Sequence, residues 1–471
     1  MKLVNPSNPV TSAWLAEQGF RLDPAPYLSG ALEAKKLLER FPRTDKLSEV
    51  TAGHNGGIFN GPKFSRIYLH DPERTVPFLG STDMMEADLS FLPRLSKEVA
   101  EKFPYLKIEP GMTLISCSGT IGRMAYVRSD MKGICSSQHI MKVAPKSGHM
   151  LSGYLYTFLR SPYGVPMIAS SAYGAIIQHI EPHHIAGLPV PRFGEKLEQK
   201  VHELVEEASQ LRTAFQEGVV AATEDLFRCV GLPELNELRW HQQERDLGFG
   251  VKGVGAVSLR ASNYGERARR IKEAFTAVPN LPLGEICRGG KLSRGLRAAR
   301  LETGEGHGVR LLGQRQAFWN RPEDRWIKKS NDPGIFAEDE TIMVTAQGLV
   351  SESGLFGRSM FVTGSWLKYA YTEHFLRVYS PSSEISGAYL FSFFRSEVAF
   401  RLMRSMLAGT GPQSIHPALL AELPIPLAPP ADRERIAETV RQAYRDRDQA
   451  DVLEDQALAL LTEAIEREAA V

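Results

Sequence analysis

Two glycines and an arginine stand close together in the segment ISCSGTIGRMAYV (115–127), at Gly119, Gly122 and Arg123. Glycines beside a basic residue are typical of loops whose backbone approaches a phosphate or the edge of a base. The alternative is purely structural, a turn between two strands in which glycine supplies a positive φ. Both interpretations are open from this segment alone.

Catalytic and nucleotide-binding motifs are incomplete wherever the sequence approaches them. GEICRGGKLS (284–293) is close to a P-loop, but Gly290 stands where lysine should follow the second glycine. RSPYG (160–164) is similar to the (D/N/S)PPY signature of amino-methyltransferases but lacks its second proline. His183 and His184 could be metal ligands, but adjacent side chains point in different directions, so a surface or hydrogen-bonding role is favoured. We therefore expect no catalytic activity, no metal site and no cofactor on this chain.

Composition and charge indicate an ordinary globular protein. Of its 471 residues, 43% are hydrophobic and 24% are charged, and the formal net charge is +1. This length predicts two or three domains, and the charge requires that any polyanion be bound by a local patch. No signal peptide and no long apolar segment is present, and there is no CxxC pair among Cys117, Cys135, Cys229 and Cys287. We expect reduced thiols, no membrane contact and a cytoplasmic location.

The second half of the chain repeats the first. A shift of 235 residues aligns 27 identities among the 110 positions of residues 119–228, whereas unrelated chains give roughly 6–7%. The matched segments include GTIGR (119–123) with GLFGR (354–358), SQHI (137–140) with TEHF (372–375), YLYTFLRS (154–161) with YLFSFFRS (389–396), and IEPHHIAGLPVP (180–191) with IHPALLAELPIP (415–426). The chain is therefore two copies of one module of about 235 residues.

Each module follows the same predicted order of elements. A helical lead-in precedes short β-branched and aromatic runs cut by Gly and Pro, which predicts a β-rich domain with some helix. Residues 153–170 are predicted as one helix, and the prolines of LPVP (188–191) and LPIP (423–426) are predicted to end one element before the next helix begins. The second module carries an insertion of about seven residues before its glycine turn, in TAQGLVSES (345–353).

A long amphipathic helix is predicted after each module. Residues 195–228 have heptad spacing with a weak position at Gly218, and such a helix would be roughly 50 Å long. The apolar positions are Leu197, Val201, Leu204, Ala208, Leu211, Phe215 and Ala222, and in the repeat (431–468) Ile436, Val440, Ala443, Leu453, Ala457, Leu461 and Ile465. Each helix could cap its own module, or the two could pack together and hold the modules at a fixed distance. We favour the second arrangement, because it covers both apolar stripes.

Positive charge is concentrated in the second module. Residues 283–329 contain eleven Lys and Arg residues against five acidic ones. The interleaved aromatic residues are Phe318, Trp319 and Trp326. This composition is typical of surfaces that neutralise phosphates, although a solvated face is the alternative. The first module is less basic over the matching stretch, where Lys63 and Arg66 are among the few cations.

Taken together, these segments resemble the specificity (S) subunit of type I restriction–modification systems. The resemblance rests on LISCSGTIGRMAYV, SSQHIMKV, YGAIIQHIEPHHIAGLPVP and the lead-in GFRLDPAPYLSGALEAKKLLE, and it spans essentially the whole chain. It implies an α+β fold in which two duplicated target recognition domains are separated by two long antiparallel coiled-coil helices. The implied segments are a lead-in (1–45), recognition domain 1 (46–193), spacer helix 1 (194–230), a helical connector (231–280), recognition domain 2 (281–428) and spacer helix 2 (429–471).

The resemblance also implies a function and partners. Each recognition domain would read one half of a bipartite site in double-stranded DNA, and the helices would fix the gap between the halves. The subunit would not be catalytic. It would direct adenine methylation by two modification subunits and cleavage by a restriction subunit, with S-adenosylmethionine, ATP and Mg²⁺ bound only by those partners.

The candidate DNA-binding residues lie in the repeated segments and the basic stretch. In the first module they are Lys63, Arg66, Gly119, Thr120, Gly122, Arg123, Gln138, His139, Tyr173, Gln178 and His179. In the second they are Lys291, Arg294, Arg297, Arg315, Gly354, Gly357, Arg358, His374 and Gln413. Glu373 replaces the glutamine of SQHI, so contacts need not transfer from one module to the other.

Two functions of other classes remain open. The modules could bind proteins, as a scaffold in a related phage-defence complex, or the chain could be a self-sufficient DNA-modifying enzyme. The absence of a cofactor motif argues against the enzyme.

Overall fold

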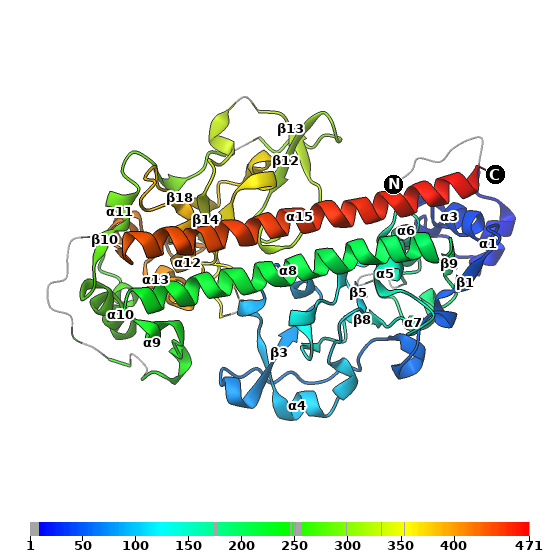
Figure 1. Ribbon diagram of the computed structural model, residues 1–471, viewed down its shortest axis with the longest axis horizontal. Coiled ribbons are helices and arrows are strands. Elements are labelled where there is room, and N and C mark those ends of the chain that lie inside the picture. The colour runs from blue at the N-terminus through cyan, green and yellow to red at the C-terminus, as the bar shows by residue number, and fades with distance from the viewer. Residues whose placement is uncertain are drawn as a thin grey trace. The chain divides into compact units, whose positions relative to one another are not determined.

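The computed structural model describes residues 9–173, 178–244, 247–248, 250, 257–297, 299–330, 332–352 and 354–470. The chain forms two compact units. Unit 1 contains the described residues up to Thr213 together with those from Gln449 onward, and unit 2 runs from Ala214 to Asp448. Both divisions fall inside long helices, α8 (Glu195–Cys229) and α15 (Pro430–Ala469), which are green and red in Figure 1.

Unit 1 is a mixed domain of short strands and helices. Its helices before α8 are α1 (Ser12–Glu17), α2 (Ala25–Leu28), α3 (Ala31–Leu38), α4 (Lys97–Glu101), α5 (Ser152–Arg160), α6 (Gly164–Ser170) and α7 (Pro182–Ile185). Its strands are β1 (Thr44–Lys46), β2 (Ile58–Phe59), β3 (Thr75–Leu79), β4 (Arg94–Ser96), β5 (Thr113–Ser116), β6 (Met124–Tyr126), β7 (Cys135–Ser136), β8 (Ile140–Val143) and β9 (Pro189–Pro191). They form sheets of order β2-β8-β5-β6, β4-β3-β7 and β1-β9.

Unit 2 repeats this architecture. Its helices between α8 and α15 are α9 (Pro233–Asn236), α10 (Glu266–Thr276), α11 (Leu283–Ile286), α12 (Gly387–Phe394), α13 (Glu397–Ser405) and α14 (Pro417–Ala421). Its strands are β10 (Asn280–Pro282), β11 (Lys291–Arg294), β12 (Gly308–Leu312), β13 (Trp326–Lys328), β14 (Thr341–Thr345), β15 (Gln347–Gly348), β16 (Ser359–Val362), β17 (Ala370–Tyr371), β18 (Phe375–Tyr379), β19 (Leu407–Ala408), β20 (Gln413–Ile415) and β21 (Pro424–Pro426). The sheets β11-β18-β14-β16, β13-β12-β17 and β10-β21 correspond to the three sheets of unit 1, and β15-β20-β19 is a fourth.

The predicted mixed fold with duplicated modules is therefore confirmed. The repeat extends to single hydrogen bonds: Tyr154 Oη donates to the carbonyl of Pro191 at 2.5 Å, and its counterpart Tyr389 donates to Pro426 at 3.0 Å. The domain boundaries expected from the sequence stay a prediction.

One predicted helix is two helices in the structure. Residues 153–170 divide into α5 and α6 at Ser161 and Pro162. Ser161 Oγ accepts from the backbone N–H of Gly164 at 3.1 Å, and Pro162 has no N–H to donate. A side-chain acceptor and a missing donor begin a new helix here, in spite of the continuous apolar pattern.

The exit prolines also form structure that the sequence pattern did not indicate. Pro189–Pro191 is strand β9, paired antiparallel with β1, and Pro424–Pro426 is β21, paired with β10. Proline is tolerated in such two-stranded edges, because a strand with one neighbour leaves every second N–H unpaired. Each module is thus closed by pairing its entry strand with its exit strand.

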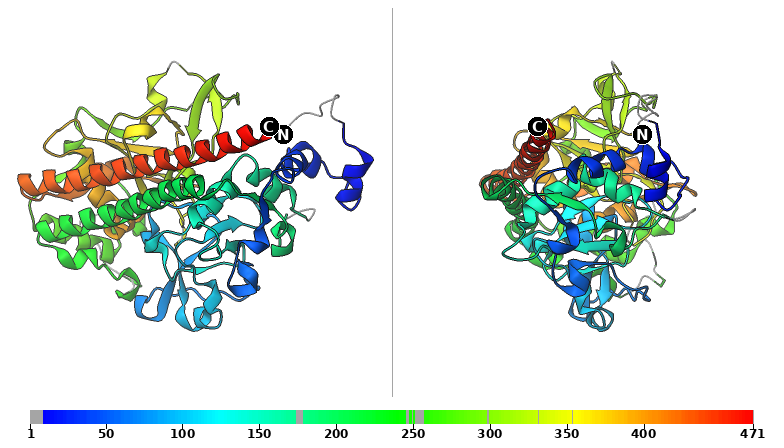
Figure 2. Two further views of the ribbon diagram at one scale, coloured as in Figure 1. Left: turned by 45° about the vertical axis from the view of Figure 1, so that its right-hand side comes forward. Right: turned by 90° about the vertical axis from the view of Figure 1, so that its right-hand side faces the viewer.

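The long helices bury their predicted apolar stripes. In unit 1, Val201, Leu204 and Ala208 of α8 join one hydrophobic core with Leu453, Ala457, Leu461 and Ile465 of α15. In unit 2 the contacts are Phe215 with Tyr444, Gly218 with Ala443, and Asp225 with Arg435. Rising numbers in α8 meet falling numbers in α15, so the two halves run antiparallel within unit 2. Each helix half also packs on its own module, and Figures 1 and 2 let the two helices be followed.

At Gly218, which the sequence indicated as a weak position of the heptad pattern, α8 comes close to α15. A Cβ placed on Gly218 would lie 3.0 Å from the Cβ of Ala443. Two small residues facing each other let the helix backbones come together. No helix among the described residues combines the length and apolar character needed to cross a membrane.

Candidate nucleic-acid interface

The same edge of the main sheet is built in both modules. In unit 1, Ser116 at the end of β5 pairs with Ile140 at the start of β8. In unit 2, Thr345 at the end of β14 pairs with Phe375 at the start of β18. Because antiparallel strands place the end of one beside the start of the next, the residues just beyond them meet at one edge. We call this the loop edge of each module.

Seven predicted residues of the first module meet at its loop edge. The N–H of Cys117 donates to the carbonyl of His139 at 3.0 Å, and the N–H of Gly119 donates to that of Gln178 at 3.2 Å. Tyr173 and His179 exchange backbone hydrogen bonds of 2.9 and 2.8 Å. The remaining contact joins Arg66 and Gln138, Nη2 to Oε1, at 3.2 Å.

The surroundings of His139 at this edge favour its neutral form. Burial lowers its pKa, and the charges of Arg66 and His179 lower it further. Because a neutral imidazole carries both a donor and an acceptor, His139 can hydrogen-bond a base edge without adding charge. Lys63 is exposed in the loop that follows β2, on the same stretch as Arg66.

The glycine phrase is a turn between strands. Gly119 and Gly122 have φ values of 76° and 90°, and the strands on either side, β5 and β6, pair antiparallel. Both glycine N–H groups donate within the protein, Gly122 to the carbonyl of Ser116 at 3.1 Å. They are therefore not free to cradle a phosphate. The turn presents Thr120, which is exposed, and Arg123, which is half-buried.

The corresponding turn in the second module is longer. The N–H of Gly357 donates to the carbonyl of Thr345 at 2.8 Å, as Gly122 does to Ser116, and Arg358 stands at the place of Arg123. Arg358 lies 5.5 Å from the ring centre of Phe318.

The structure corrects the alignment of Gly119 with Gly354. Gly348, with a φ of 153°, pairs with Gln413, as Gly119 contacts Gln178. Gly354 lies inside the extra residues, where its carbonyl accepts from Arg404 at 3.0 Å. Gly348 is therefore the counterpart of Gly119. The constant shift of 235 residues aligned Gly354 instead, because the extra residues of the second module follow Gly348.

A polar chain runs along the loop edge of the second module. Arg294 Nη1 donates to Gln347 Oε1 at 3.3 Å, and the same oxygen lies 2.6 Å from His374 Nδ1. Arg294 Nη2 also donates to Ser414 Oγ at 2.6 Å. Beside it, Arg260 Nη1 donates to Gln413 Oε1 at 2.8 Å. Sequence reasoning missed Arg260, Gln347 and Ser414, since only the pairing of β15 with β20 brings them to the edge.

Acidic residues pair with much of the basic stretch. Glu373 contacts Arg300 at 2.8 Å and Arg297 at 3.7 Å. Partial burial would raise the pKa of Glu373, but the hydrogen bonds from its own N–H and from Arg300 outweigh burial and lower the pKa. The other ion pairs are Lys291 with Glu338, Arg288 with Glu285, Arg310 with Asp324, and Arg325 with Glu302. Of these acidic partners only Glu338 and Glu373 lie outside residues 283–329, so only they reduce the excess of positive charge counted along that stretch.

The aromatic residues of this stretch do not form a stacking face. Trp319 is buried in the core, and the ring of Trp326 lies under the guanidinium of Arg310 at 5.0 Å. Arg315 is exposed at the start of a short 3₁₀ turn, 316–318. Lys291 lies at the end of β11 away from the loop edge, so the structure does not bring it to the cluster of Arg294.

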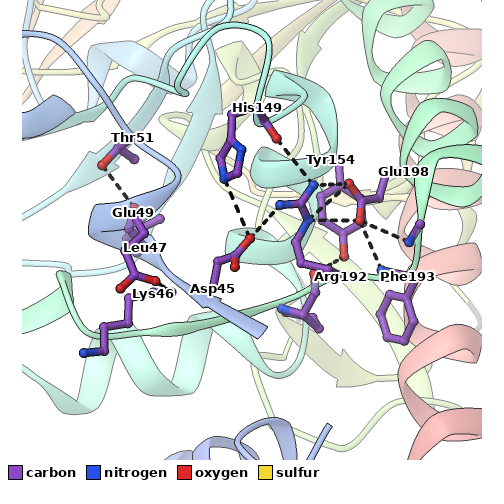
Figure 3. A network of polar contacts seen from close by, with 12 residues as sticks. Asp45, Lys46, Leu47, Glu49, Thr51, His149, Tyr154, Arg192, Phe193 and Glu198 are labelled. Atoms are coloured by element: carbon purple, nitrogen blue, oxygen red, sulfur yellow. Dashed lines mark hydrogen bonds and ion pairs between the residues drawn. The ribbon is translucent and has the colours of Figure 1, made fainter. Parts of the chain in front are cut away.

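A network of charges fixes the start of α8 on its module (Figure 3). Arg192 donates to Glu198 through Nε at 3.1 Å and Nη2 at 2.9 Å, and to Asp45 of β1 through Nη1 at 2.6 Å. Glu198 also accepts from the N–H groups of Phe193 and Gly194, which ties the residues before α8 to its first turn. The bond to Glu198 raises the pKa of Arg192, so this guanidinium stays charged. The direction of α8 is thereby tied to the strand pair β1-β9.

Three solved structures similar to this chain belong to one class of protein. All three of those described next are S (HsdS) subunits of type I restriction–modification systems, the family that the sequence resembles.

The S subunit from M. genitalium is 12% identical with a TM-score of 0.38, over 91% of this chain and 96% of that chain. HsdS from Thermoanaerobacter tengcongensis is 12% identical with a TM-score of 0.27, over 90% and 96%. A structure described for complex assembly and conformational transition of the type I system is 14% identical with a TM-score of 0.26, over 90% and 98%. No family model and no curated protein matches the chain.

Proposed function

We propose that this chain is the DNA-recognition subunit of a type I restriction–modification complex. Each module reads one half of a bipartite duplex site at its loop edge. The proposal rests on one observation: both modules have the same strand pairing at the loop edge but different side chains on it. The first module has Arg66 with Gln138, and the second has Arg300 with Glu373. A duplicated framework with different side chains suits two different half-sites.

The long helices supply a spacer in this proposal. At about 1.5 Å per residue, the 35 residues of α8 measure about 50 Å. Each helix begins on one module and ends in the other unit, so its length sets the number of base pairs between half-sites. Two modification subunits methylate adenine with S-adenosylmethionine, and a restriction subunit cleaves with ATP and Mg²⁺. This chain itself supplies no catalytic group.

The test is made in cells. The chain is expressed with its modification subunit, and methylated adenines are mapped by long-read sequencing. We expect a bipartite motif that disappears when the chain is omitted. Exchange of residues 46–193 for the recognition domain of another S subunit should replace one half-site and keep the other. A defined motif with the modification subunit alone would overturn the proposal, and methyl transfer by the purified chain alone would indicate an enzyme.

A protein-binding scaffold is the second candidate, favoured by the acidic partners of the basic stretch. Ion pairs with acidic residues outside the stretch, such as Lys291 with Glu338, lower the positive charge available to phosphates. A gel shift with duplex DNA at increasing salt separates the two functions. DNA recognition predicts binding that weakens steeply with salt, whereas a scaffold shows no shift even at low ionic strength.

A further inference from the structure

Both modules place an arginine on the same position of the loop edge. Gln138 and Glu373 each precede a histidine whose carbonyl accepts a backbone hydrogen bond, from Cys117 in one module and from Ala346 in the other. Arg66 and Arg300 come from corresponding loops, because β2 and β11 occupy the same place beside β8 and β18. The folding of each module therefore creates one arginine pair, with an amide partner in the first and a carboxylate partner in the second.

The second pair is oriented toward solvent through its arginine. Arg300 Nη2 contacts Glu373 Oε2 at 2.8 Å and Oε1 at 3.0 Å. The Glu373 side chain is 20% exposed and that of Arg300 is 37% exposed. The carboxylate is thus the less exposed member of the pair. Both contacts use Nη2, so a fork aimed at a base would consist of Nη1 and the second hydrogen of Nη2.

The fork of Arg300 fits a guanine, and its carboxylate partner makes a phosphate the less favoured ligand. A planar guanidinium with two parallel donors matches the O6 and N7 acceptors of guanine in the major groove. A carboxylate within hydrogen-bond distance offsets the positive charge and so weakens attraction to phosphate. Arg297 has the opposite properties, since its side chain is 85% exposed and its Nε lies 3.7 Å from Glu373.

We infer that Arg300, held in place by Glu373, reads a guanine in the half-site of the second module. Arg297 neutralises a neighbouring phosphate. Glu373 is a positioning residue that acts through Arg300. The inference rests on the proposed function and deepens it, because it names a base and the side chain that reads it.

The experiment compares two matched substitutions in the complex with the modification subunit. R300K and R297K both keep the charge and remove the fork. Methylated adenines are mapped for each, and binding is measured on duplexes in which each guanine of the second half-site is replaced by adenine. Wild type should prefer guanine at one position by about tenfold or more. R300K should lose that preference, while R297K and the first half-site keep theirs.

Substitution of Glu373 separates positioning from a structural role. E373Q leaves a neutral acceptor, so Arg300 is held less firmly and its charge is no longer offset. We expect a weaker guanine preference at the same position and a salt dependence steeper by about one phosphate contact. E373D keeps the charge and should restore most of the preference. A variant that merely misfolds would reduce binding to every duplex equally.

The outcomes distinguish the inference from the function on which it rests. If wild type directs no bipartite motif, the proposed function is wrong. If a bipartite motif appears but R300K keeps every base preference, or if the second half-site contains no guanine, the inference is wrong and the function stands.

Discussion

Arg212 of α8 and Glu454 of α15 form a buried ion pair in unit 1, with Nε and Oε1 3.2 Å apart. Asp451 accepts from the same guanidinium at 2.7 Å, and Arg160 of α5 donates to Glu454 at 2.9 Å. Burial opposes the charge of Arg212, but the two carboxylates outweigh it and raise its pKa. This cluster joins both long helices to the first module.

Arg447, the repeat counterpart of Arg212, is held in a different way. Its guanidinium carbon Cζ lies 3.9 Å from the ring centre of Trp366, and its Nη2 donates to the carbonyl of Trp319 at 2.9 Å. The two aligned arginines thus act differently: Arg212 stabilises unit 1 through ion pairs, and Arg447 stabilises unit 2 through an aromatic contact.

Replacement of Arg212 by methionine should strongly destabilise the protein. R212M leaves two carboxylates in a site where the side chain of Glu454 is 8% exposed. Breaking a buried ion pair costs about 3 kcal/mol or more in free energy of unfolding. Urea denaturation measures it, with R445M as control, because Arg445 is exposed and should change stability by about 0.5 kcal/mol at most. Equal effects of the two variants would mean that the cluster does not stabilise the helix pair.

Lys142 should make stability depend on alkaline pH. Its side chain is fully buried, and burial lowers its pKa to about 8, whereas the unfolded chain keeps the ordinary value near 10.4. Between these values the unfolded state binds the proton and the native state does not, so this lysine destabilises the fold below pH 8. The destabilisation disappears as pH rises toward 10.4, a change of about 3 kcal/mol.

The measurement compares wild type with K142M from pH 7 to pH 10. The free energy of unfolding of wild type should rise relative to that of K142M over this window. K142M also loses the bond to the carbonyl of Ile140, which changes its stability by the same amount at every pH. Arg377 stands at the repeat position and stays charged throughout, so R377M should show no such trend. Parallel pH curves for wild type and K142M would contradict the lowered pKa.

Substitution of Gly218 should show that helix packing outweighs helix propensity. Alanine favours a helix over glycine by about 1 kcal/mol, but its Cβ would lie 3.0 Å from that of Ala443. G218A should therefore gain little, and G218L should lose roughly 1–3 kcal/mol by overpacking. The exchange G218A/A443G keeps the space and should restore stability close to wild type. If G218L melts as wild type does, the two helices are not in close contact here.

The proposed spacer can be tested by lengthening both helices together. Four residues inserted after Thr213 and four after Asp448 fall where the two units divide, so contacts within each unit are kept. Each insertion adds about 6 Å, nearly two base-pair rises of DNA. The methylated motif should have a longer gap between unchanged half-sites. Changed half-sites with the same gap would show that the helices do not set the spacing.

The sequence by itself determined the duplication, the mixed fold and the two long helices. Repetition at a constant shift and heptad spacing are local signals, and Val201, Leu204 and Ala208 are buried as their periodicity predicts. The turn between β5 and β6 was one of two interpretations that the sequence left open, and the strand pairing and the positive φ of Gly119 and Gly122 decide for it.

Tertiary structure decided which side chains meet. Arg260, Gln347 and Ser414 are distant in sequence and come together only through strand pairing at the loop edge. A count of charges along the chain could not show that Glu373 pairs with Arg300, because the partner lies on another strand connection. Gly218 changed from a weak helix position to a contact point for the same reason: its neighbour is Ala443, which only the folded helix pair supplies.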